Sequence, residues 1–242
     1  YYGPENIRCE EVETPQPQEG ELLVKVMSAL TCGTDVKTYR RGHPVLIKKI
    51  PSGFGHEFSG IVEAVGKGVT KFKVGDRIVS ANSAPCGDCF YCQKEQFNLC
   101  ENLDLLNGAY AQYIIIPKRI ADKNTLLLPD NLSFDKAVFS EPLANVVHGI
   151  ERTQIHAGDT VGILGLGPIG LMFARLAKLK GARVFAGARN PMKLQKALDF
   201  AHVDGIIDLK NCENIPKAFK EVSGCERGLD VMVECIGLPE MW

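Results

Sequence analysis

A glycine-rich turn at residues 165–170 constrains the fold of this chain more than any other feature. The segment Gly165-Leu166-Gly167-Pro168-Ile169-Gly170 matches the pattern G-x-G-x-x-G. It follows a short apolar run, Thr160–Leu164, and opens Pro168–Leu179, which is apolar at helical spacing. A strand before the turn and a helix after it are the context of a phosphate-binding turn. We predict that it holds the pyrophosphate of a dinucleotide at the helix N-terminus; a purely structural glycine turn is the alternative.

The sequence from residue 133 onward repeats this alternation of strand and helix. Ser133 is a suitable N-cap for a helix over residues 134–150. Further strands are predicted at 183–187, 205–207 and 229–235, and further helices at 191–200 and 213–222. Such alternation indicates a parallel sheet, so we predict a Rossmann-type cofactor-binding domain over 133–242. These domains normally have six strands; we therefore expect that a C-terminal portion is missing from this sequence, and that the N-terminus, which lacks Met, is clipped too.

The first 132 residues follow another pattern. Short β-type runs are broken by Gly, Pro and Asn, and they predict strands at 21–27, 60–65, 77–80 and 111–116. This pattern suits an antiparallel, barrel-like domain. We predict such a domain over residues 1–132.

Composition excludes several function classes. With 28 basic and 29 acidic residues and a net charge of −1, the chain shows neither a nucleic-acid footprint nor a polybasic membrane anchor. No apolar run reaches the roughly 18 residues of a membrane span. Nine cysteines, four of them between residues 86 and 100, argue against a secreted disulfide framework and for metal binding in a reducing compartment. We expect a cytoplasmic protein without membrane or nucleic-acid partners.

The clustered cysteines predict a structural zinc site in a lobe at about residues 84–102. Four thiolates and no open position make a closed tetrahedral site, which stabilises the fold and does no chemistry. Iron–sulfur clusters use other cysteine spacings, and a zinc-ribbon nucleic-acid module would need basic flanks that this sequence lacks. Four free cysteines on a loop are the remaining alternative. The predicted ligands are Cys86, Cys89, Cys92 and Cys100.

Three separate segments offer a thiolate, an imidazole and carboxylates for a second metal ion. They are Cys32-Gly33-Thr34-Asp35, Gly55-His56-Glu57 and Ser140-Glu141-Pro142. None is a metal motif alone, because a single His is more often a structural residue than a ligand. Together they match a catalytic zinc site, in which three protein ligands leave one position open. Zinc with an open position can stabilise the alkoxide from which a hydride leaves.

The residues after the second predicted strand of the cofactor domain bear on the choice of cofactor. An acid there would bind the ribose 2′-hydroxyl of NAD, but this chain has Gly187-Ala188-Arg189-Asn190. A guanidinium can hold a 2′-phosphate bidentately. We predict a cofactor site that includes Ala188, Arg189 and Asn190 and prefers NADP(H) to NAD(H); the alternative is that Arg189 is a solvated surface charge.

These elements, in this order, resemble the medium-chain zinc-dependent alcohol dehydrogenase superfamily over nearly the whole chain. The segment Gly55-His56-Glu57-Phe58-Ser59-Gly60, the four-cysteine lobe and the glycine-rich turn carry the resemblance. The run Glu141-Pro142-Leu143-Ala144 and the adjoining His148 are similar to the sorbitol (polyol) and threonine dehydrogenase branch. The resemblance implies a GroES-like antiparallel β-barrel catalytic domain joined to a Rossmann domain.

The resemblance also implies roles for individual residues. Cys32 and His56 would ligate the catalytic zinc, with Glu57 or Glu141 as the third ligand, directly or through water. Asp35 would orient His56, which suits a metal-bound imidazole. Thr34 would hydrogen-bond the substrate oxygen and begin a proton relay. Alcohol dehydrogenases often continue that relay with a His where this chain has Lys37, so the outer relay departs from the family pattern.

The predicted function is reversible hydride transfer between a secondary alcohol or polyol and a nicotinamide cofactor, with two zinc ions per chain, one catalytic and one structural. The alternatives are an L-threonine or simple secondary-alcohol dehydrogenase, a sugar-ketone reductase, or a non-catalytic cofactor-binding relative of the fold. Retention of Cys32, His56, Glu57 and Glu141 argues against the last. We expect a small-molecule substrate and a homo-oligomer, dimeric or tetrameric.

Overall fold

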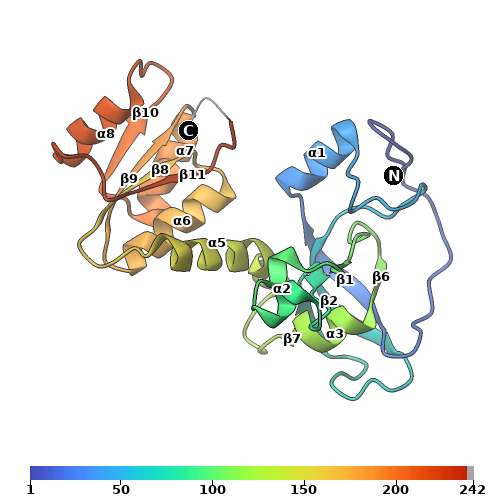
Figure 1. Cartoon of the computed structure of the whole chain (residues 1–242). Coiled ribbons are helices and arrows are strands. Elements are labelled where there is room, and N and C mark those ends of the chain that lie inside the picture. Colours follow the sequence, from blue (N-terminus) through green and yellow to red (C-terminus); the bar gives the residue numbers. More distant parts are fainter. Residues whose placement is uncertain (239–242) are drawn as a thin grey trace. The chain divides into compact units, whose positions relative to one another are not determined.

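The computed structural model describes residues 1–238, which form two compact units (Figure 1). The first unit is Tyr1–Glu141 and the second begins at Pro142. A boundary between folding domains at residue 133 stays a prediction. Within the described part, no helix combines the length and hydropathy needed to cross a lipid bilayer.

The first unit is built on a five-stranded antiparallel sheet in the order β6-β1-β2-β3-β7. Alternate residues of these strands point to one face, where side chains such as Leu22, Val24, Val62 and Ile78 are fully buried in a single apolar cluster. The strands are β1 (Leu22–Leu30), β2 (Glu57–Val65), β3 (Arg77–Ser80), β6 (Tyr113–Ile116) and β7 (Thr125–Leu127). All four strands expected from the sequence are present.

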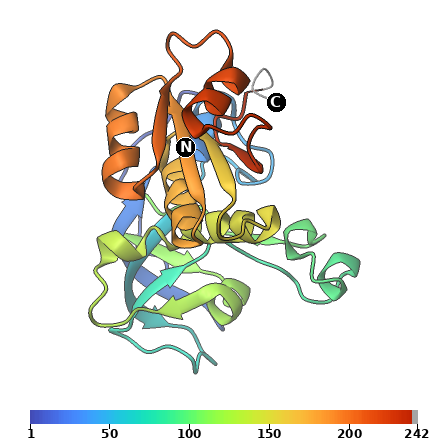
Figure 2. The ribbon, with the colours of Figure 1, turned by 90° about the vertical axis from the view of Figure 1, so that its left-hand side faces the viewer.

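Three helices and a lobe accompany this sheet. The helices are α1 (Gly33–Arg41), α3 (Lys118–Asn124) and α4 (Phe134–Ala137). The lobe consists of α2 (Phe90–Gln93) and the 3-10 turn η1 (Phe97–Leu99) between the paired strands β4 (Ser83–Ala84) and β5 (Asp104–Leu105). It projects from the sheet of its own unit, in green in Figure 2.

The second unit contains a four-stranded parallel sheet in the order β10-β9-β8-β11. Its strands are β8 (Thr160–Leu164), β9 (Arg183–Ala188), β10 (Gly205–Asp208) and β11 (Val231–Glu234). Its helices are α5 (Ser140–Thr153), whose first two residues belong to the first unit, α6 (Pro168–Leu179), α7 (Pro191–Lys196), which continues as the π turn η2 (Ala197–Ala201), and α8 (Ile215–Ser223). The expected parallel sheet with intervening helices is therefore present.

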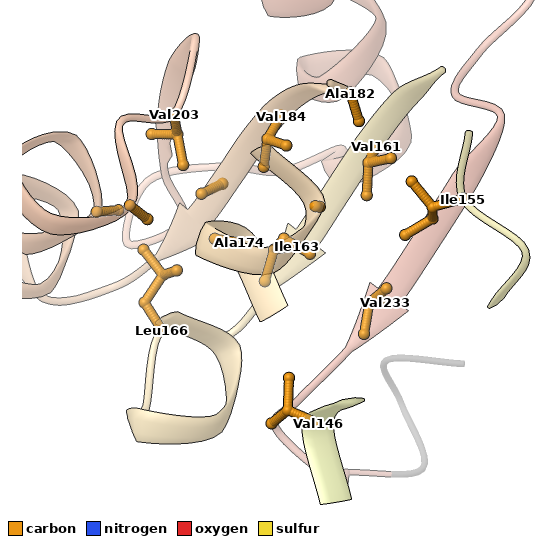
Figure 3. Packing of buried hydrophobic residues seen from close by; sticks show 14 of the residues in the cluster. Val146, Ile155, Val161, Ile163, Leu166, Ala174, Ala182, Val184, Val203 and Val233 are labelled. Carbon is orange, nitrogen blue, oxygen red and sulfur yellow. The ribbon is translucent and has the colours of Figure 1, made fainter. Parts of the chain in front are cut away.

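Helices cover both faces of this sheet. Ile163 of β8 belongs to the larger cluster, with Ala174 of α6 and Val146 of α5 (Figure 3). Its neighbour Leu164 belongs to a separate cluster with Phe219 of α8. Because consecutive strand residues point to opposite faces, a strand buried on both sides needs a continuous apolar run, which Val161–Leu164 of β8 supplies after the buried Thr160.

The helix expected over residues 134–150 is wrong as a single element. The chain forms α4, which ends at Ala137, and then α5, which begins at Ser140. A continuous helix would place Pro142 in its interior, where proline removes one hydrogen bond and clashes with the preceding turn. The interruption moves Pro142 into the first turn of α5, where backbone N–H groups have no partner within the helix.

Candidate functional site

The antiparallel register of β1 and β2 brings together three of the predicted zinc ligands. Leu30, the last residue of β1, pairs with Glu57, the first residue of β2. Cys32 lies just beyond the end of β1, and His56 lies just before β2. The ligand atoms of Cys32, His56 and Glu57 all lie within 4.8 Å of one another. A thiolate, an imidazole and a carboxylate at this separation fit a zinc site.

Cys32 is held in place as the N-cap of α1. Its Sγ accepts from the backbone N–H of Thr34 at 3.4 Å, and its own N–H donates to Asp35 Oδ2 at 2.8 Å. This reciprocal arrangement is a capping box built on a cysteine. Thr34 is half-buried in the first turn of the helix, directly beside the thiol.

Asp35 also fixes the orientation of His56. Its Oδ1 lies 3.1 Å from His56 Nδ1, and both residues are buried, at 5% and 3% exposure. Neutral imidazole has one N–H. With that hydrogen on Nδ1, donated to the carboxylate, Nε2 keeps the lone pair that a metal ion needs.

The charges of these groups are coupled. Burial raises the pKa of Asp35, but hydrogen bonds from His56, the Cys32 amide and Tyr110 outweigh it, so its pKa is lowered. Burial lowers the pKa of His56, yet its contacts with Asp35 and Cys32 raise it to about 10. Burial and then the charge of Glu141 raise the pKa of Glu57. Several charged groups are therefore buried together at this site, and such clusters with perturbed pKa values are typical of functional sites.

Glu141 lies apart from the three clustered ligands. Among the described residues, the group within 4.8 Å contains Cys32, His56 and Glu57 only. Glu141, the second residue of α5, is nevertheless close enough for its charge to act on Glu57. The structure therefore places both carboxylates near the candidate site, with Glu57 next to the thiol and the imidazole.

The four cysteines of the lobe converge. Cys86 Sγ lies 3.8 Å from Cys92 Sγ and 3.5 Å from Cys100 Sγ, and Cys89 Sγ lies 4.0 Å from Cys100 Sγ. A tetrahedral ZnS₄ centre with Zn–S bonds of about 2.3 Å has sulfurs about 3.8 Å apart. The backbone N–H of Cys86 donates to Cys100 Sγ at 3.2 Å, and amides near Cys89 lower the pKa of that thiol to about 6. The donor set fits a zinc ion.

Two basic residues of α3, which sequence reasoning missed, contact both ends of the lobe. Lys123 Nζ lies 2.9 Å from the Pro85 carbonyl oxygen and 3.1 Å from that of Cys86. Arg119 donates to the Asn102 carbonyl oxygen at 2.7 Å and lies 3.4 Å from the Asp104 carboxylate. A zinc ion bound by four thiolates would carry a charge of about −2, which these two cations would partly balance.

The three glycines of the turn meet three different constraints. Gly165 has φ +96°, a left-handed conformation that favours glycine. A Cβ at Gly167, the N-cap of α6, would meet no atom within 4 Å, so this side of the backbone is open to a ligand. A Cβ at Gly170 would overlap the carbonyl oxygen of Gly165. This geometry, with Pro168 at the first helical position, fits a pyrophosphate cradle.

A pocket adjoins the turn. Arg189 lines it, and so does Asn190, whose Oδ1 also caps α7 by accepting from Met192 N–H at 2.9 Å. Two charged residues that the sequence did not single out line the same pocket: Lys193, in the first turn of α7, and Glu213, which follows β10. Its other lining residues are Gly165, Leu166, Ala188, Leu209, Cys212, Ile215, Ile236 and Leu238.

Two family models match the chain. Residues 18–129 match the alcohol dehydrogenase GroES-like domain, and residues 168–242 match the zinc-binding dehydrogenase domain. The first unit therefore has the GroES-like fold and the second the Rossmann fold that the sequence predicted.

Known proteins align with the chain over nearly its whole length. It is 33% identical to sorbitol dehydrogenase of Bacillus subtilis (strain 168), over 96% of this chain and 66% of the relative, and 35% identical to L-threonine 3-dehydrogenase of Bacillus velezensis, over 95% and 66%. A solved zinc-binding dehydrogenase from Sinorhizobium meliloti 1021, bound to NADP, superposes with a TM-score of 0.87 and 34% identity, covering 98% of this chain and 68% of that one. The chain thus spans about two thirds of the length of these relatives. With both domain types present and such identities along its length, the chain belongs to the zinc-dependent medium-chain alcohol dehydrogenase superfamily, in the branch of the sorbitol and threonine dehydrogenases.

Proposed function

We propose that this protein is an NADP(H)-preferring dehydrogenase of secondary alcohols, polyols above all. The observation that carries this proposal is the convergence of Cys32, His56 and Glu57 next to the buried Asp35. We assign Cys32, His56 and Glu57 as resting ligands of a catalytic zinc, with Glu141 as the carboxylate that can replace Glu57, and Cys86, Cys89, Cys92 and Cys100 as ligands of a structural zinc. When bound, a catalytic zinc supplies Lewis acidity that lowers the pKa of a substrate hydroxyl.

The residues around the site have separate roles in proton transfer and in orienting the ligands. In oxidation the substrate loses a hydride from carbon to the nicotinamide ring and a proton from oxygen to solvent, so the carbinol becomes a ketone. Thr34 Oγ1 accepts the substrate proton and passes it outward. Asp35 keeps the proton of His56 on Nδ1 and so keeps the ring in one orientation.

The substrate class follows from what the relatives' names share. Sorbitol and L-threonine both carry a second heteroatom, oxygen or nitrogen, on the carbon next to the oxidised carbinol. The cluster of this chain includes a carboxylate besides the thiol and the imidazole, which suits a polar, multiply hydroxylated substrate. We therefore favour vicinal diols and polyols over simple secondary alcohols.

The cofactor preference is supported by the pocket beside the glycine-rich turn. Arg189 and Lys193 both line it, and two cations suit a 2′-phosphate. Glu213 opposes this preference, because a carboxylate repels phosphate and can accept from a ribose hydroxyl. We propose that Arg189 and Lys193 together outweigh Glu213. A cytoplasmic location and a homo-oligomer remain parts of the proposal.

The test is turnover by the zinc-replete protein of a matched pair, butane-2,3-diol and butan-2-ol, with sorbitol and L-threonine alongside, each with NADP⁺ and NAD⁺. The proposal expects a higher kcat/KM for the diol than for butan-2-ol, and for NADP⁺ than for NAD⁺. Equal turnover before and after zinc removal would contradict the role of the metal. A preference for butan-2-ol would overturn the substrate class.

A further inference from the structure

Tyr110 joins the candidate catalytic site from a segment that has no part in the predicted ligand set. Its hydroxyl oxygen lies 2.8 Å from Asp35 Oδ2 and 3.0 Å from the Leu30 carbonyl oxygen. A phenol has one proton to donate. The carboxylate is the nearer acceptor and carries the charge, and hydrogen bonds to charged acceptors are the stronger ones.

The two oxygens of Asp35 consequently have separate partners. Oδ2 accepts from the Cys32 amide at 2.8 Å and from Tyr110, whereas Oδ1 faces His56 Nδ1 at 3.1 Å. Asp35 is only 5% exposed, so water contributes little to its solvation. Two donors on Oδ2 prevent the carboxylate from rotating away from the imidazole.

The backbone around Tyr110 holds it against the loop that carries His56. The N–H groups of Gly108 and Ala109 both donate to the Gly55 carbonyl oxygen, at 2.7 and 2.9 Å, and Tyr110 N–H donates to the Phe54 carbonyl oxygen at 2.8 Å. Gly55 has φ +85°, and a Cβ there would overlap the Tyr110 ring. The ring therefore packs on the residue that immediately precedes His56.

We infer that Tyr110 is a positioning residue of the catalytic metal site, which acts by fixing Asp35 and, through Asp35, the imidazole of His56. This inference rests on the proposed assignment of Cys32, His56 and Glu57 as zinc ligands. Partners that orient a metal-bound His typically change metal affinity by about 10- to 100-fold. Tyr110 acts one residue further out, so its hydroxyl should contribute near the lower end of that range.

The test measures zinc binding by the full chain, without substrate or cofactor, by competition with a chromogenic chelator that resolves two sites. Tyr110→Phe keeps the ring on Gly55 and removes only the hydroxyl. Tyr39→Phe is the matched control, because the Tyr39 hydroxyl bonds the Glu5 carbonyl oxygen at 3.3 Å, away from the ligands. We expect Tyr110→Phe to weaken one of two zinc sites about tenfold while Tyr39→Phe changes neither. A thermal melt of each metal-free variant checks that the fold is kept.

A second experiment combines Tyr110→Phe with Asp35→Asn. If Tyr110 acts through Asp35, adding Tyr110→Phe to Asp35→Asn causes no further loss of zinc affinity. An unchanged affinity in Tyr110→Phe, or an equal loss in the Asp35→Asn background, would overturn the inference. A wild-type chain that binds zinc at the four-cysteine lobe alone would instead overturn the proposed function on which it rests.

Discussion

Asp35 Oδ1 lies 3.1 Å from His56 Nδ1, with 5% and 3% of the two residues exposed. The buried carboxylate is thereby kept ionised, and the imidazole is kept in a single orientation. Asp35 lies in α1, which follows β1, and His56 immediately precedes β2, so the pairing of these two strands brings the two residues together.

Replacing Asp35 with Asn should weaken zinc binding at the catalytic site by about 10- to 100-fold. The Asn side chain has no charge, so its hydrogen bond with the Nδ1–H group of His56 is weaker than that of the Asp35 carboxylate. Chelator competition measures the effect, and Asp122→Asn, which removes an exposed acid of α3 paired with Lys118, serves as the control. Equal zinc affinity in Asp35→Asn and the wild type would contradict this role.

Replacing Cys89 with Ser should lower zinc content from about two ions per chain to about one, because the closed site needs all four thiolates. Elemental analysis of the purified variant gives the number. Limited proteolysis should also show new cleavage between residues 86 and 100, since the metal holds that lobe together. The control is Cys9→Ser, at an exposed cysteine, which should retain both zinc ions. A Cys89→Ser protein that still binds two zinc ions would refute the assignment of Cys89 as a structural zinc ligand.

Lys123→Met should speed zinc release from the lobe about fivefold. A charged hydrogen bond contributes about 1.5–3 kcal/mol, and solvent exposure reduces this to about 1 kcal/mol. Lys123 bonds the carbonyl oxygens of Pro85 and Cys86, so its loss frees the start of the lobe. Stopped-flow release to a chelator reports the rate. The control is Lys118→Met, on the same helix, because Lys118 pairs with an exposed carboxylate; this variant should leave the rate of zinc release unchanged.

Arg189→Gln and Lys193→Gln should each raise the Kd for NADPH about tenfold and leave that for NADH nearly unchanged. Glu213→Gln should do the opposite and tighten NADPH binding, because Glu213 is the one acid among the described residues that line the pocket. Fluorescence titration of both cofactors separates these effects. Lys196→Gln, on α7 outside the pocket, is the control. Equal losses of affinity for NADPH and NADH would show that neither cation binds the 2′-phosphate.

Asp204→Asn should destabilise the second unit at neutral pH and not in acid. Burial raises the pKa of Asp204, but hydrogen bonds from Lys178 and the Val184 amide lower it overall. A carboxyl group whose pKa is lower in the folded than in the unfolded chain stabilises the fold. This stabilisation is fully present above the unfolded-state pKa of about 3.9, and it is lost as the pH falls through the folded-state pKa. Because the side chain is 36% exposed, we expect about 1 kcal/mol at pH 7. Urea unfolding at pH 7 and pH 3 tests it, with Asp199→Asn as control; a difference from the wild type that persists undiminished at pH 3 would contradict the linkage.

The sequence predicted most accurately those elements whose pattern is local. The strand Thr160–Leu164 and the helix Pro168–Leu179 begin and end where the apolar runs and the glycine-rich turn indicated. Helix α1 was not anticipated, because Cys32 is an unusual N-cap and Gly33–Arg41 has little apolar periodicity.

The parts of the candidate site that sequence reasoning missed depend on long-range contacts. Tyr110 reaches Asp35 across 75 positions of the chain, and no local pattern marks it. Glu213 lines the pocket beside the glycine-rich turn because β10 pairs with β9 in parallel, which brings the ends of both strands to one edge. Lys123 shares a helix face with Arg119, but only the folded lobe shows what they contact.

The register of β1 and β2 has a consequence for the order in which the two proposed zinc sites would fill. The lobe's ligands lie on one short loop, with Cys86 and Cys100 only 14 positions apart, so little loop entropy opposes early zinc capture by a nascent chain. Cys32 and His56, by contrast, are brought together by the pairing of Leu30 with Glu57 in the sheet. We therefore expect the two ions to enter in a fixed order, the lobe first. When zinc is scarce, chains should accumulate that have zinc in the lobe and none at the proposed catalytic site.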